Sequence, residues 1–466
     1  MLKILLFSRN ALFFRIYSII LLALSFGADV QGQTSPKTET NEIAFVHVNV
    51  IPMNRNTVLP DMTVLVRDGK IKAIGRYGKI SIPGGAQKVE ARGKYLLPGL
   101  GDMHTHFSGN EPIDRALLNL HLVNGVTTVL SLGGSPEILK LREAISFGRI
   151  SGPNFYTAGP TVDDANLTRE AGIRLVDEHK RLGYDVVKPY NRLSLEGYRG
   201  IMLRANQINI PVVGHVVRAV GLEGTLGSGQ HGIVHLEEYL YTYTPFRISK
   251  TEQIPSEVLN PASIPYLAQV TAKAGVWVTP TLVTFVWVLA QTENSEAAIS
   301  RHEARYIPEG LFQGMWDPKV NKLGRPLEQL GNVKAAMDFQ RQMVKPFRDA
   351  GVKLLLGTDA PIPAVVPGFG AHEELLNFVE AGLTPYEALE TATVNPARYL
   401  GREKEFGTIE IGKQADLILL EANPLEDIKN TKKLAGVMVR GRWFSKSELR
   451  QMLSDLPLRD VKPAQK

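Results

Sequence analysis

Hydrophobic and polar positions alternate in short runs near both ends of the chain, as expected for β-strands with one buried face. In the N-terminal part such runs occupy residues 44–50, 62–66 and 70–75, and turn formers such as Asp68 and Gly69 separate them. Similar runs return at 406–409, 415–420 and 436–441. We therefore expect residues 43–95 and 405–445 to combine into one small accessory β-sandwich domain, formed from both ends of the chain.

The central region, residues 96–404, follows a different rhythm, in which apolar runs alternate with amphipathic stretches of helical length. The apolar runs lie at 96–100, 126–132, 155–158, 184–187, 210–214, 232–234, 275–281 and 352–358. Eight strand-type runs with crossover helices predict an α/β protein with a (β/α)8, or TIM, barrel.

Two spacings between these runs are longer than a single helix requires. They leave insertions at about 236–274 and 286–350, and the second contains two stretches with a helical pattern, 293–307 and 327–348. Because insertions after strands project from the active face of a barrel, we expect these segments to form a lid and much of the substrate pocket.

Residue types that bind metals close five of the apolar runs. The first run leads through a Pro-Gly bend to a His-x-His pair, and the fourth, fifth, sixth and eighth lead to Lys, His, His and Asp. The candidate ligands are His104, His106, Lys188, His215, His235 and Asp359. The C-terminal ends of barrel strands converge on one mouth, and imidazole and carboxylate groups suit zinc. The pattern therefore predicts a metal site at that mouth.

Each candidate ligand also has a structural explanation. A His-x-His pair occurs on solvated strands as well, the alkyl chain of Lys188 can carry its amine to solvent, and Asp359 can cap a helix. The recurrence of ligand types at the ends of five separate runs favours the metal site, because packing does not require polar groups at these positions.

Four further residues are candidates for contact with a substrate: Tyr190, Arg218, His372 and Tyr239. Tyr190 lies two residues after the lysine of the fourth run, and Arg218 follows the fifth run, where it can pair with an anionic group. Tyr239 follows the sixth run and His372 the eighth. The alternatives are a packed tyrosine at a strand end, a solvated arginine and an exposed histidine that caps a helix.

Composition and charge exclude several classes of protein. The 466 residues are 44% hydrophobic and 21% charged, with a formal net charge of +6, which is typical of a globular protein. The sequence contains no tract of Lys and Arg, so nucleic acid is not an expected partner. It also contains no cysteine, which excludes disulfides, cysteine metal ligands and thiol nucleophiles.

The first 33 residues have the pattern of a secretory signal peptide. Lys3, Arg9 and Arg15 precede an apolar run at 16–26, and small and polar residues follow as far as residue 33. We expect export to the periplasm or the extracellular space. The alternative is an uncleaved N-terminal membrane anchor, for which the apolar run is short. A homo-oligomer is compatible with the sequence, which does not decide the oligomeric state.

Several motifs resemble those of the amidohydrolase superfamily, in particular its imidazolonepropionase-like and Xaa-Pro dipeptidase-like branch. They are PGLGDMHTH, YDVVKPY, VVGHV, GIVHLEEY, LLLGTDAP, TATVNPARYLG and FGTIEIGKQADLILLEANP, and the similarity extends over about residues 43–445. The resemblance implies that His104, His106 and Asp359 hold a buried metal. It further implies that Lys188, carbamylated by CO2, bridges to a second metal held by His215 and His235. Residues 216–218 differ from the His-Ala-His type of segment that is common in relatives. Because the ligand position His215 is present, this difference bears on the identity of the substrate more than on metal binding.

Together these residues predict an exported, metal-dependent hydrolase with two divalent ions, zinc being the expected metal, that cleaves the amide or peptide C–N bond of a small molecule. A hydroxide bridging the metals would attack the carbonyl carbon, and Asp359 would pass the proton to the leaving amine. Two alternatives remain. One is a lactonase or phosphotriesterase-like esterase on the same dizinc site, and the other is a non-catalytic barrel that binds a ligand.

Overall fold

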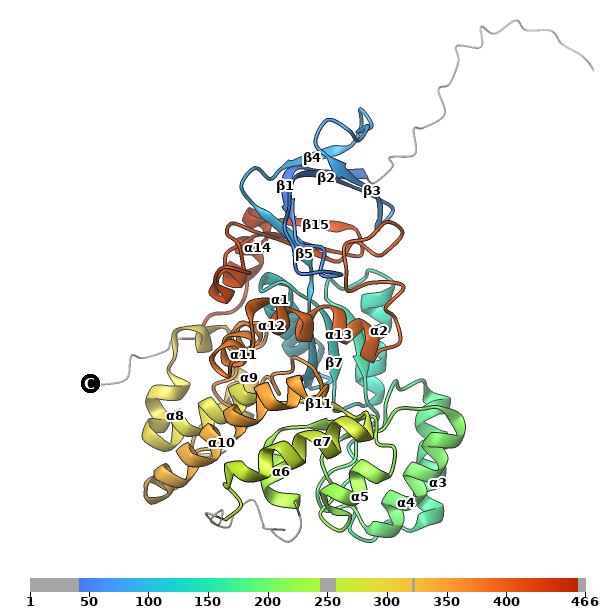
Figure 1. Cartoon of the computed structure of the whole chain (residues 1–466), viewed down its shortest axis with the longest axis vertical. Coiled ribbons are helices and arrows are strands. Elements are labelled where there is room, and N and C mark those ends of the chain that lie inside the picture. The colour runs from blue at the N-terminus through green and yellow to red at the C-terminus, as the bar shows by residue number, and fades with distance from the viewer. Residues whose placement is uncertain (1–41, 244–256, 321–322, 460–466) are drawn as a thin grey trace, which may run out of the picture. The chain divides into compact units, whose positions relative to one another are not determined.

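The computed structural model describes residues 42–243, 257–320 and 323–459 (Figure 1). The signal peptide expected at 1–33 and part of the first expected insertion, 244–256, lie outside the described residues. The strands are β1 (Glu42–Val50), β2 (Leu59–Arg67), β3 (Lys70–Arg76), β4 (Gln87–Glu90), β5 (Tyr95–Pro98), β6 (Leu100–Thr105), β7 (Val126–Ser131), β8 (Asn154–Thr157), β9 (Val213–Gly214), β10 (Gly232–Val234), β11 (Trp277–Thr279), β12 (Lys353–Leu354), β13 (Leu417–Leu420), β14 (Leu434–Val439) and β15 (Arg442–Ser445).

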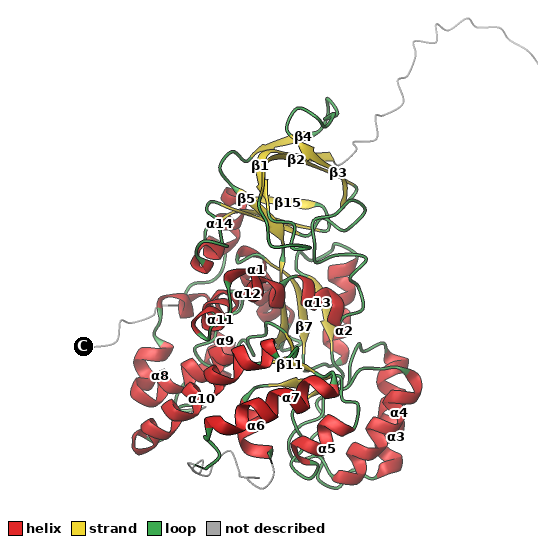
Figure 2. Cartoon of the chain, viewed as in Figure 1, coloured by secondary structure: helices red, strands yellow, loops and turns green. Residues whose placement is uncertain are grey.

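The helices lie mostly between the strands of the central region (Figure 2). They are α1 (Glu111–Val123), α2 (Pro136–Ser146), α3 (Arg169–Leu182), α4 (Leu195–Ile208), α5 (Gly221–Gly227), α6 (Glu237–Thr242), α7 (Ile264–Ala274), α8 (Leu282–Ile299), α9 (Glu309–Leu311), α10 (Leu330–Asp349), α11 (Phe369–Glu380), α12 (Pro385–Ala392), α13 (Val394–Tyr399) and α14 (Lys446–Ser454). Short turns η1 (Pro261–Ser263), η2 (His302–Tyr306), η3 (Phe312–Trp316), η4 (Leu327–Gln329) and η5 (Ile428–Lys432) complete them. Among the described helices, none combines the length and the apolar character that a membrane-spanning segment needs.

Strands from both ends of the chain form one eight-stranded sheet (Figure 1). Its order is β15-β14-β13-β5-β1-β2-β3, and β4 pairs with β1. β5 joins the two ends of the chain, because it is parallel to β1 and antiparallel to β13, with Leu97 opposite Ile418. The sequence predicted a β-sandwich. The strands share one hydrogen-bonded sheet, and this sheet folds over on itself: the rings of Phe45 in β1 and Trp443 in β15, four places apart in the strand order, have centroids 5.1 Å apart. The run 406–409, expected to be a strand, forms no strand.

The central region contains parallel strands that alternate with helices, which confirms the α/β class. β6, β7 and β8 form a three-stranded sheet, and β9 to β12 form a four-stranded sheet. Single parallel bridges link these sheets: Ala158 with Val186, Val187 with Val212, and Thr105 with Ala360. The expected fourth strand contributes only such bridges. The described strands therefore do not form one continuous closed sheet, because β9 to β12 are only two or three residues long.

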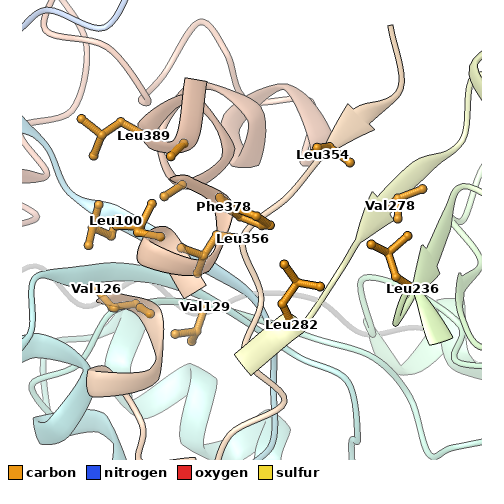
Figure 3. Packing of buried hydrophobic residues seen from close by; sticks show 14 of the residues in the cluster. Leu100, Val126, Val129, Leu236, Val278, Leu282, Leu354, Leu356, Phe378 and Leu389 are labelled. Carbon is orange, nitrogen blue, oxygen red and sulfur yellow. The ribbon is translucent and has the colours of Figure 1, made fainter. Parts of the chain in front are cut away.

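The main hydrophobic core lies between the parallel strands and the helices around them (Figure 3). Leu100 of β6 and Val129 of β7 belong to it, as do Phe378 of α11 and Leu389 of α12, and all four are fully buried. Full burial of such a side chain contributes roughly 1.5–3 kcal/mol. The core therefore fixes the strands from whose ends the candidate ligands emerge.

The second insertion is helical, but its first helix has other bounds than the sequence predicted. α8 spans Leu282–Ile299 but breaks at Asn294, whose φ and ψ are −157° and 98°. One helix was expected at 293–307, so its start lies near this break, and its end was wrong because α8 ends before the turn η2. α10 spans Leu330–Asp349, close to the expected 327–348. The early start of α8 depends on a distant residue: the carboxylate of Glu374 in α11 accepts the backbone N–H groups of Leu282 and Val283 at 2.9 and 2.7 Å. Local sequence does not reveal such a cap.

The start of α12 follows local sequence closely. Thr384 and Glu387 form a reciprocal capping box, and Pro385 occupies the first turn, as their order in the sequence predicted. The expected helix 384–400 is divided into α12 and α13 at Thr393, whose φ and ψ are −126° and −75°.

Candidate metal centre

The candidate ligands emerge where the short parallel strands end. His104 lies in β6 and is fully buried, whereas the His106 side chain, just past the strand, keeps 34% of its surface exposed. His235 follows β10 and Asp359 follows β12, and both have positive φ angles, 67° and 60°. A positive φ is uncommon for a residue with a side chain and is often found at functional sites.

Asp359 gathers three imidazoles around its carboxylate. Its Oδ1 lies 2.9 Å from Nε2 of His106 and 3.1 Å from Nε2 of His104, and its Oδ2 lies 3.9 Å from Nε2 of His235. The ligand atoms of His104, His235 and Asp359 all lie within 4.8 Å of one another. The family resemblance instead implies a set of His104, His106 and Asp359. In the structure both His106 and His235 lie next to Asp359.

The histidines form a continuous row of rings. The ring centroid of His104 lies 5.3 Å from that of His106 and 4.7 Å from that of His235. His215, after β9, follows at 4.8 Å from His235. The structure thus brings together all four histidines that the sequence singled out, although they are separated by up to 131 residues along the chain.

Lys188 belongs to the same buried centre. Its side chain is 1% exposed, and its positive charge lowers the pKa of His104, so the amine lies near that imidazole. Gly214 makes room for it, because a Cβ at this position would lie 3.1 Å from Cδ of Lys188 and 2.4 Å from the Pro189 carbonyl oxygen. The glycine in the sequence before His215 is therefore part of the site.

The electrostatics of the centre favour the protonation states that metal ligands need. Burial lowers the pKa of His104 to about 3, and the charge of Lys188 acts in the same direction. Burial by itself would raise the pKa of Asp359, but the neighbouring His104 and His106 hold it well below its ordinary value. Near neutral pH His104 is therefore neutral and Asp359 ionised, as coordination requires.

The tautomer of His235 is set by Thr281, at the start of α8. Oγ1 of Thr281 lies 2.7 Å from Nδ1 of His235 and donates its own proton to the carbonyl oxygen of Pro280 at 2.8 Å. A hydroxyl has one proton, so it accepts the proton of Nδ1–H. The lone pair of Nε2 then faces Asp359, which is the tautomer that binds a metal.

Asp102 ties the two ligand-bearing strand ends together. Its carboxylate accepts hydrogen bonds from Oγ1 of Thr358 at 2.6 Å, from the Thr358 N–H at 3.1 Å and from the His104 N–H at 3.2 Å. Burial raises its pKa to about 7. Sequence reasoning singled out neither Asp102 nor Thr281. The available signal was a polar residue inside or next to an otherwise apolar strand.

One of the predicted substrate residues, Tyr190, lies against a candidate ligand, and Arg218 contacts an aromatic ring of α6. The ring of Tyr190 packs on His215 with centroids 4.0 Å apart, and the tyrosine is 37% exposed. The guanidinium of Arg218 lies 5.0 Å from the ring centroid of Tyr241. A buried nitrogen of Arg218, Nη1, has no hydrogen-bond partner among the described residues.

The hydrogen bonds of the other two predicted substrate residues link them to surrounding helices. The hydroxyl of Tyr239 pairs with Oγ1 of Thr271 in α7 at 3.1 Å, and Tyr239 is 1% exposed. Nδ1 of His372 pairs with Oγ1 of Thr431 at 3.0 Å, and burial lowers the pKa of His372 to about 3. These contacts give both residues a place in the packing of the helical layer. The exposed helix cap proposed as an alternative for His372 is excluded by its burial.

A divalent metal fits this centre. His104 is fully buried, and neither of its ring nitrogens satisfies the geometry of a hydrogen bond with another described residue. Buried polar atoms are otherwise almost always satisfied, so the arrangement points to a ligand outside the chain. Neutral imidazoles and an ionised carboxylate are the donors that zinc and similar cations prefer.

Comparison with known proteins agrees with this geometry. A model of the amidohydrolase family matches residues 95–444. The chain belongs to the amidohydrolase family. It is therefore a hydrolase, and the match includes all six candidate ligands, from His104 in β6 to Asp359 in the loop that follows β12.

Individual relatives of this amidohydrolase are distant. Ochratoxinase from Aspergillus niger is 27% identical over 374 residues, 72% of each chain, and imidazolonepropionase from Geobacillus sp. (strain WCH70) is 24% identical over 397 residues, 79% of this chain and 86% of the relative. Among solved structures, bottromycin amidohydrolase has a TM-score of 0.69 at 22% identity and covers 91% of this chain and 92% of its own. A Xaa-Pro dipeptidase with bound methionine has a TM-score of 0.64 at 20% identity, with 87% and 100% coverage. These structures show that the fold is shared.

Proposed function

We propose that this amidohydrolase cleaves an amide or peptide C–N bond of a small molecule with two divalent metal ions, zinc being the expected metal. The observation that carries the proposal is the carboxylate of Asp359, which lies 2.9, 3.1 and 3.9 Å from nitrogens of three histidines. The residues that would hold the ions are His104, His106, Lys188, His215, His235 and Asp359. The relatives' names, which include a dipeptidase and imidazolonepropionase, support a C–N bond as the target.

The reaction follows from the states of the side chains. Divalent ions supply a Lewis acid for the substrate carbonyl and make water acidic enough to attack near neutral pH. Asp359 is ionised and acceptor-only, so one of its carboxylate oxygens takes the proton of the attacking water. As the C–N bond breaks, the same oxygen passes this proton to the leaving nitrogen. His104 remains neutral, because burial lowers its pKa to about 3.

The role proposed for Lys188 requires chemical modification. An ammonium group cannot ligate a cation, whereas carbamylation by CO2 converts the amine into a carboxylate. The near-complete burial of Lys188 beside His104 supports this change, because an unmodified ammonium at that depth costs solvation energy without serving the metals. Growth with 13C-labelled bicarbonate followed by 13C NMR tests it. A carbamate signal present in the wild type and lost in Lys188→Met is the expected result.

The substrate proposed for the site carries a carboxylate. Arg218 supports this choice, because its buried Nη1 has no hydrogen-bond partner among the described residues and a buried donor gains most from an ionised acceptor. Tyr190, half-exposed beside His215, is proposed to contact the substrate next to the metal ligands. The contacts of Tyr239 and His372 give no support to the substrate roles expected for them.

The remaining proposals concern the chain as a whole. We place a closed (β/α)8 barrel at residues 96–404, supported by the single bridges between its parallel sheets, and the accessory domain at 43–95 and 405–445. The insertions at about 236–274 and 286–350 are proposed to cover the metal centre. The pattern of the first 33 residues supports export to the periplasm or the extracellular space.

A turnover panel tests the proposed reaction. Protein loaded with zinc and bicarbonate is assayed for amine release from dipeptides, N-acyl amino acids and cyclic amides, with Asp359→Asn as the matched variant. We expect turnover of at least one class and its loss in the variant. Lactones and phosphotriesters belong in the same panel. Turnover of esters alone would replace the C–N assignment by the esterase alternative, and binding of a compound without turnover would favour a non-catalytic barrel.

A further inference from the structure

The loop that carries Asp359 has an irregular backbone. Asp359 and Ala364 have φ angles of 60° and 70°, which non-glycine residues adopt only when surrounding contacts hold them. Inside the segment 359–365, two backbone hydrogen bonds form, from the N–H of Ile362 to the Asp359 carbonyl and from the N–H of Val365 to the Ile362 carbonyl. The remaining carbonyl groups of the segment depend on partners elsewhere.

The Ala360 carbonyl oxygen accepts the N–H of His106 at 2.7 Å and the hydroxyl of Thr105 at 3.0 Å. The insertion after β11 supplies side-chain partners for three other carbonyl groups. Nε1 of Trp316 donates to the Pro361 carbonyl oxygen. Nε2 of Gln291 donates to the Pro363 carbonyl oxygen at 3.2 Å, and Nη1 of Arg301 donates to that of Ala364 at 3.0 Å. Three carbonyl groups of the loop, those of residues 361, 363 and 364, are thus bound by three side chains of one insertion.

The three donors are themselves held in place. Trp316 is fully buried and Gln291 is 4% exposed. The guanidinium of Arg301 pairs with the carboxylates of Glu373 and Glu303 and lies 4.3 Å from the ring centroid of Trp287. Ion pairs that are partly buried and hydrogen-bonded have well-defined geometry, so Arg301 is a rigid support rather than a mobile surface charge.

The same insertion also contacts the second side of the metal centre. It continues α8, which is preceded by Thr281, the residue that orients His235, and whose first two N–H groups bind the side-chain oxygens of Glu374 in α11. Figure 1 shows α8, α10 and α11 packed together. One contiguous segment therefore contacts both His235 and the loop of Asp359, two groups whose ligand atoms lie 3.9 Å apart.

We infer that Gln291, Arg301 and Trp316 are positioning residues that hold the Asp359 loop in the conformation needed for metal binding and proton transfer. The inference rests on the role proposed above for Asp359. The family pattern of ligands does not include these three residues, and they do not touch the reacting atoms. They act by binding the backbone carbonyl groups at residues 361, 363 and 364. Loss of one donor leaves a buried carbonyl without a partner, which favours the open conformations of the loop.

The first test uses the full chain without metal or substrate. Trp316→Phe and Gln291→Met keep apolar bulk and remove one donor each, and amide hydrogen exchange is followed in peptides that cover residues 356–368. We expect the amides of Ile362 and Val365 to exchange roughly tenfold faster in each variant, while amides of β2 and β3 keep their wild-type rates. Equal acceleration throughout the chain would indicate a general loss of stability and would overturn the inference.

The second test measures the metal centre by the visible absorption of bound Co2+. We expect the two variants to bind Co2+ roughly tenfold more weakly and to show a changed absorption spectrum. For any substrate that is found, kcat should decrease while KM stays close to the wild-type value. Trp443→Phe in β15 and Gln340→Met in α10 make the same chemical changes elsewhere and should match the wild type. Variants that differ from these controls neither in loop exchange nor in Co2+ binding would refute the inference.

The two proposals fail in different ways. A protein that binds Co2+ and protects the loop, yet releases no amine from any substrate, contradicts the proposed function and leaves the positioning role intact. A protein that turns over substrate normally in Trp316→Phe and Gln291→Met contradicts the positioning role alone. Arg301→Lys adds a gradation, because lysine keeps the charge and loses the planar fork that reaches both Glu373 and the loop.

Discussion

Oγ1 of Thr281 lies 2.7 Å from Nδ1 of His235 and donates its own hydrogen bond to the Pro280 carbonyl oxygen, which fixes the imidazole with Nε2 toward Asp359. A hydroxyl at the N-cap of α8 thus orients a candidate metal ligand that follows another strand. Groups of this kind, which orient metal ligands without touching the metal, account for much of the affinity of such sites.

Replacement of Thr281 by valine is expected to weaken metal binding about 10- to 100-fold, because His235 loses the acceptor that fixes its tautomer. Isothermal titration with Zn2+ measures the change. Thr281→Ser keeps the hydroxyl and should retain most of the affinity. If valine and serine bind zinc equally well, the hydrogen bond has no role in the site.

Glu374 is expected to make stability depend on pH. Burial raises its pKa to about 8, against an ordinary value of 4.5, although the N–H groups of Val283 and Leu282 partly oppose the shift. The folded protein then retains a proton that the unfolded chain releases between pH 4.5 and 8. Stability should therefore fall as pH rises through that window and level off above pH 8.

Glu374→Gln removes the titrating group. The decrease in stability between pH 4.5 and 8 should therefore become smaller, by an amount on the order of a few kcal/mol. Urea unfolding at a series of pH values measures the change. Asp102, whose pKa is raised by burial to about 7, contributes with the same sign in both proteins, and its charge also raises the pKa of Glu374, so the difference between them contains Glu374 and this coupling. Glu380→Gln, on the exposed part of the same helix, serves as the control. An identical pH profile in wild type and Glu374→Gln would contradict the prediction.

Gly214→Ala is expected to destabilise the protein by about 1–3 kcal/mol, because the new Cβ would lie 2.4 Å from the Pro189 carbonyl oxygen and 2.8 Å from its Cδ. The displaced strand carries His215 and borders Lys188, so we also expect less bound metal per chain in elemental analysis. Gly227→Ala, where a Cβ meets nothing within 4 Å, is the matched substitution and should leave stability and metal content unchanged. Equal behaviour of the two variants would show that Gly214 is not needed for close packing.

Arg218 is expected to act on substrate binding. Arg218→Met keeps an unbranched apolar side chain and removes the guanidinium that lies over Tyr241, so KM for a carboxylate-bearing substrate should rise about 10- to 100-fold, with a smaller change in kcat. The corresponding amide of that substrate, which lacks the carboxylate, should be turned over equally by both proteins. A rise in KM for both compounds would indicate a structural role instead.

Sequence reasoning was successful where chemistry depends on local order. The capping box at Thr384, the parallel strands and the residue types at their ends are all properties of short stretches, and a ligand at a strand end needs only the strand to be placed correctly. The bounds of α8 were predicted wrongly, because its start is set by Glu374, which lies 92 residues away along the chain.

The sequence by itself determined the alternation of strands and helices, the set of six ligand-type residues and the family. Only the tertiary structure decided how these residues meet: three imidazoles around Asp359, a tautomer set by Thr281, and a loop held by Gln291, Arg301 and Trp316. The physical reason is that a residue's type and its place in a strand are local properties. A hydrogen bond between segments that are distant in sequence depends on the packing of the whole chain and leaves no periodic pattern in the sequence.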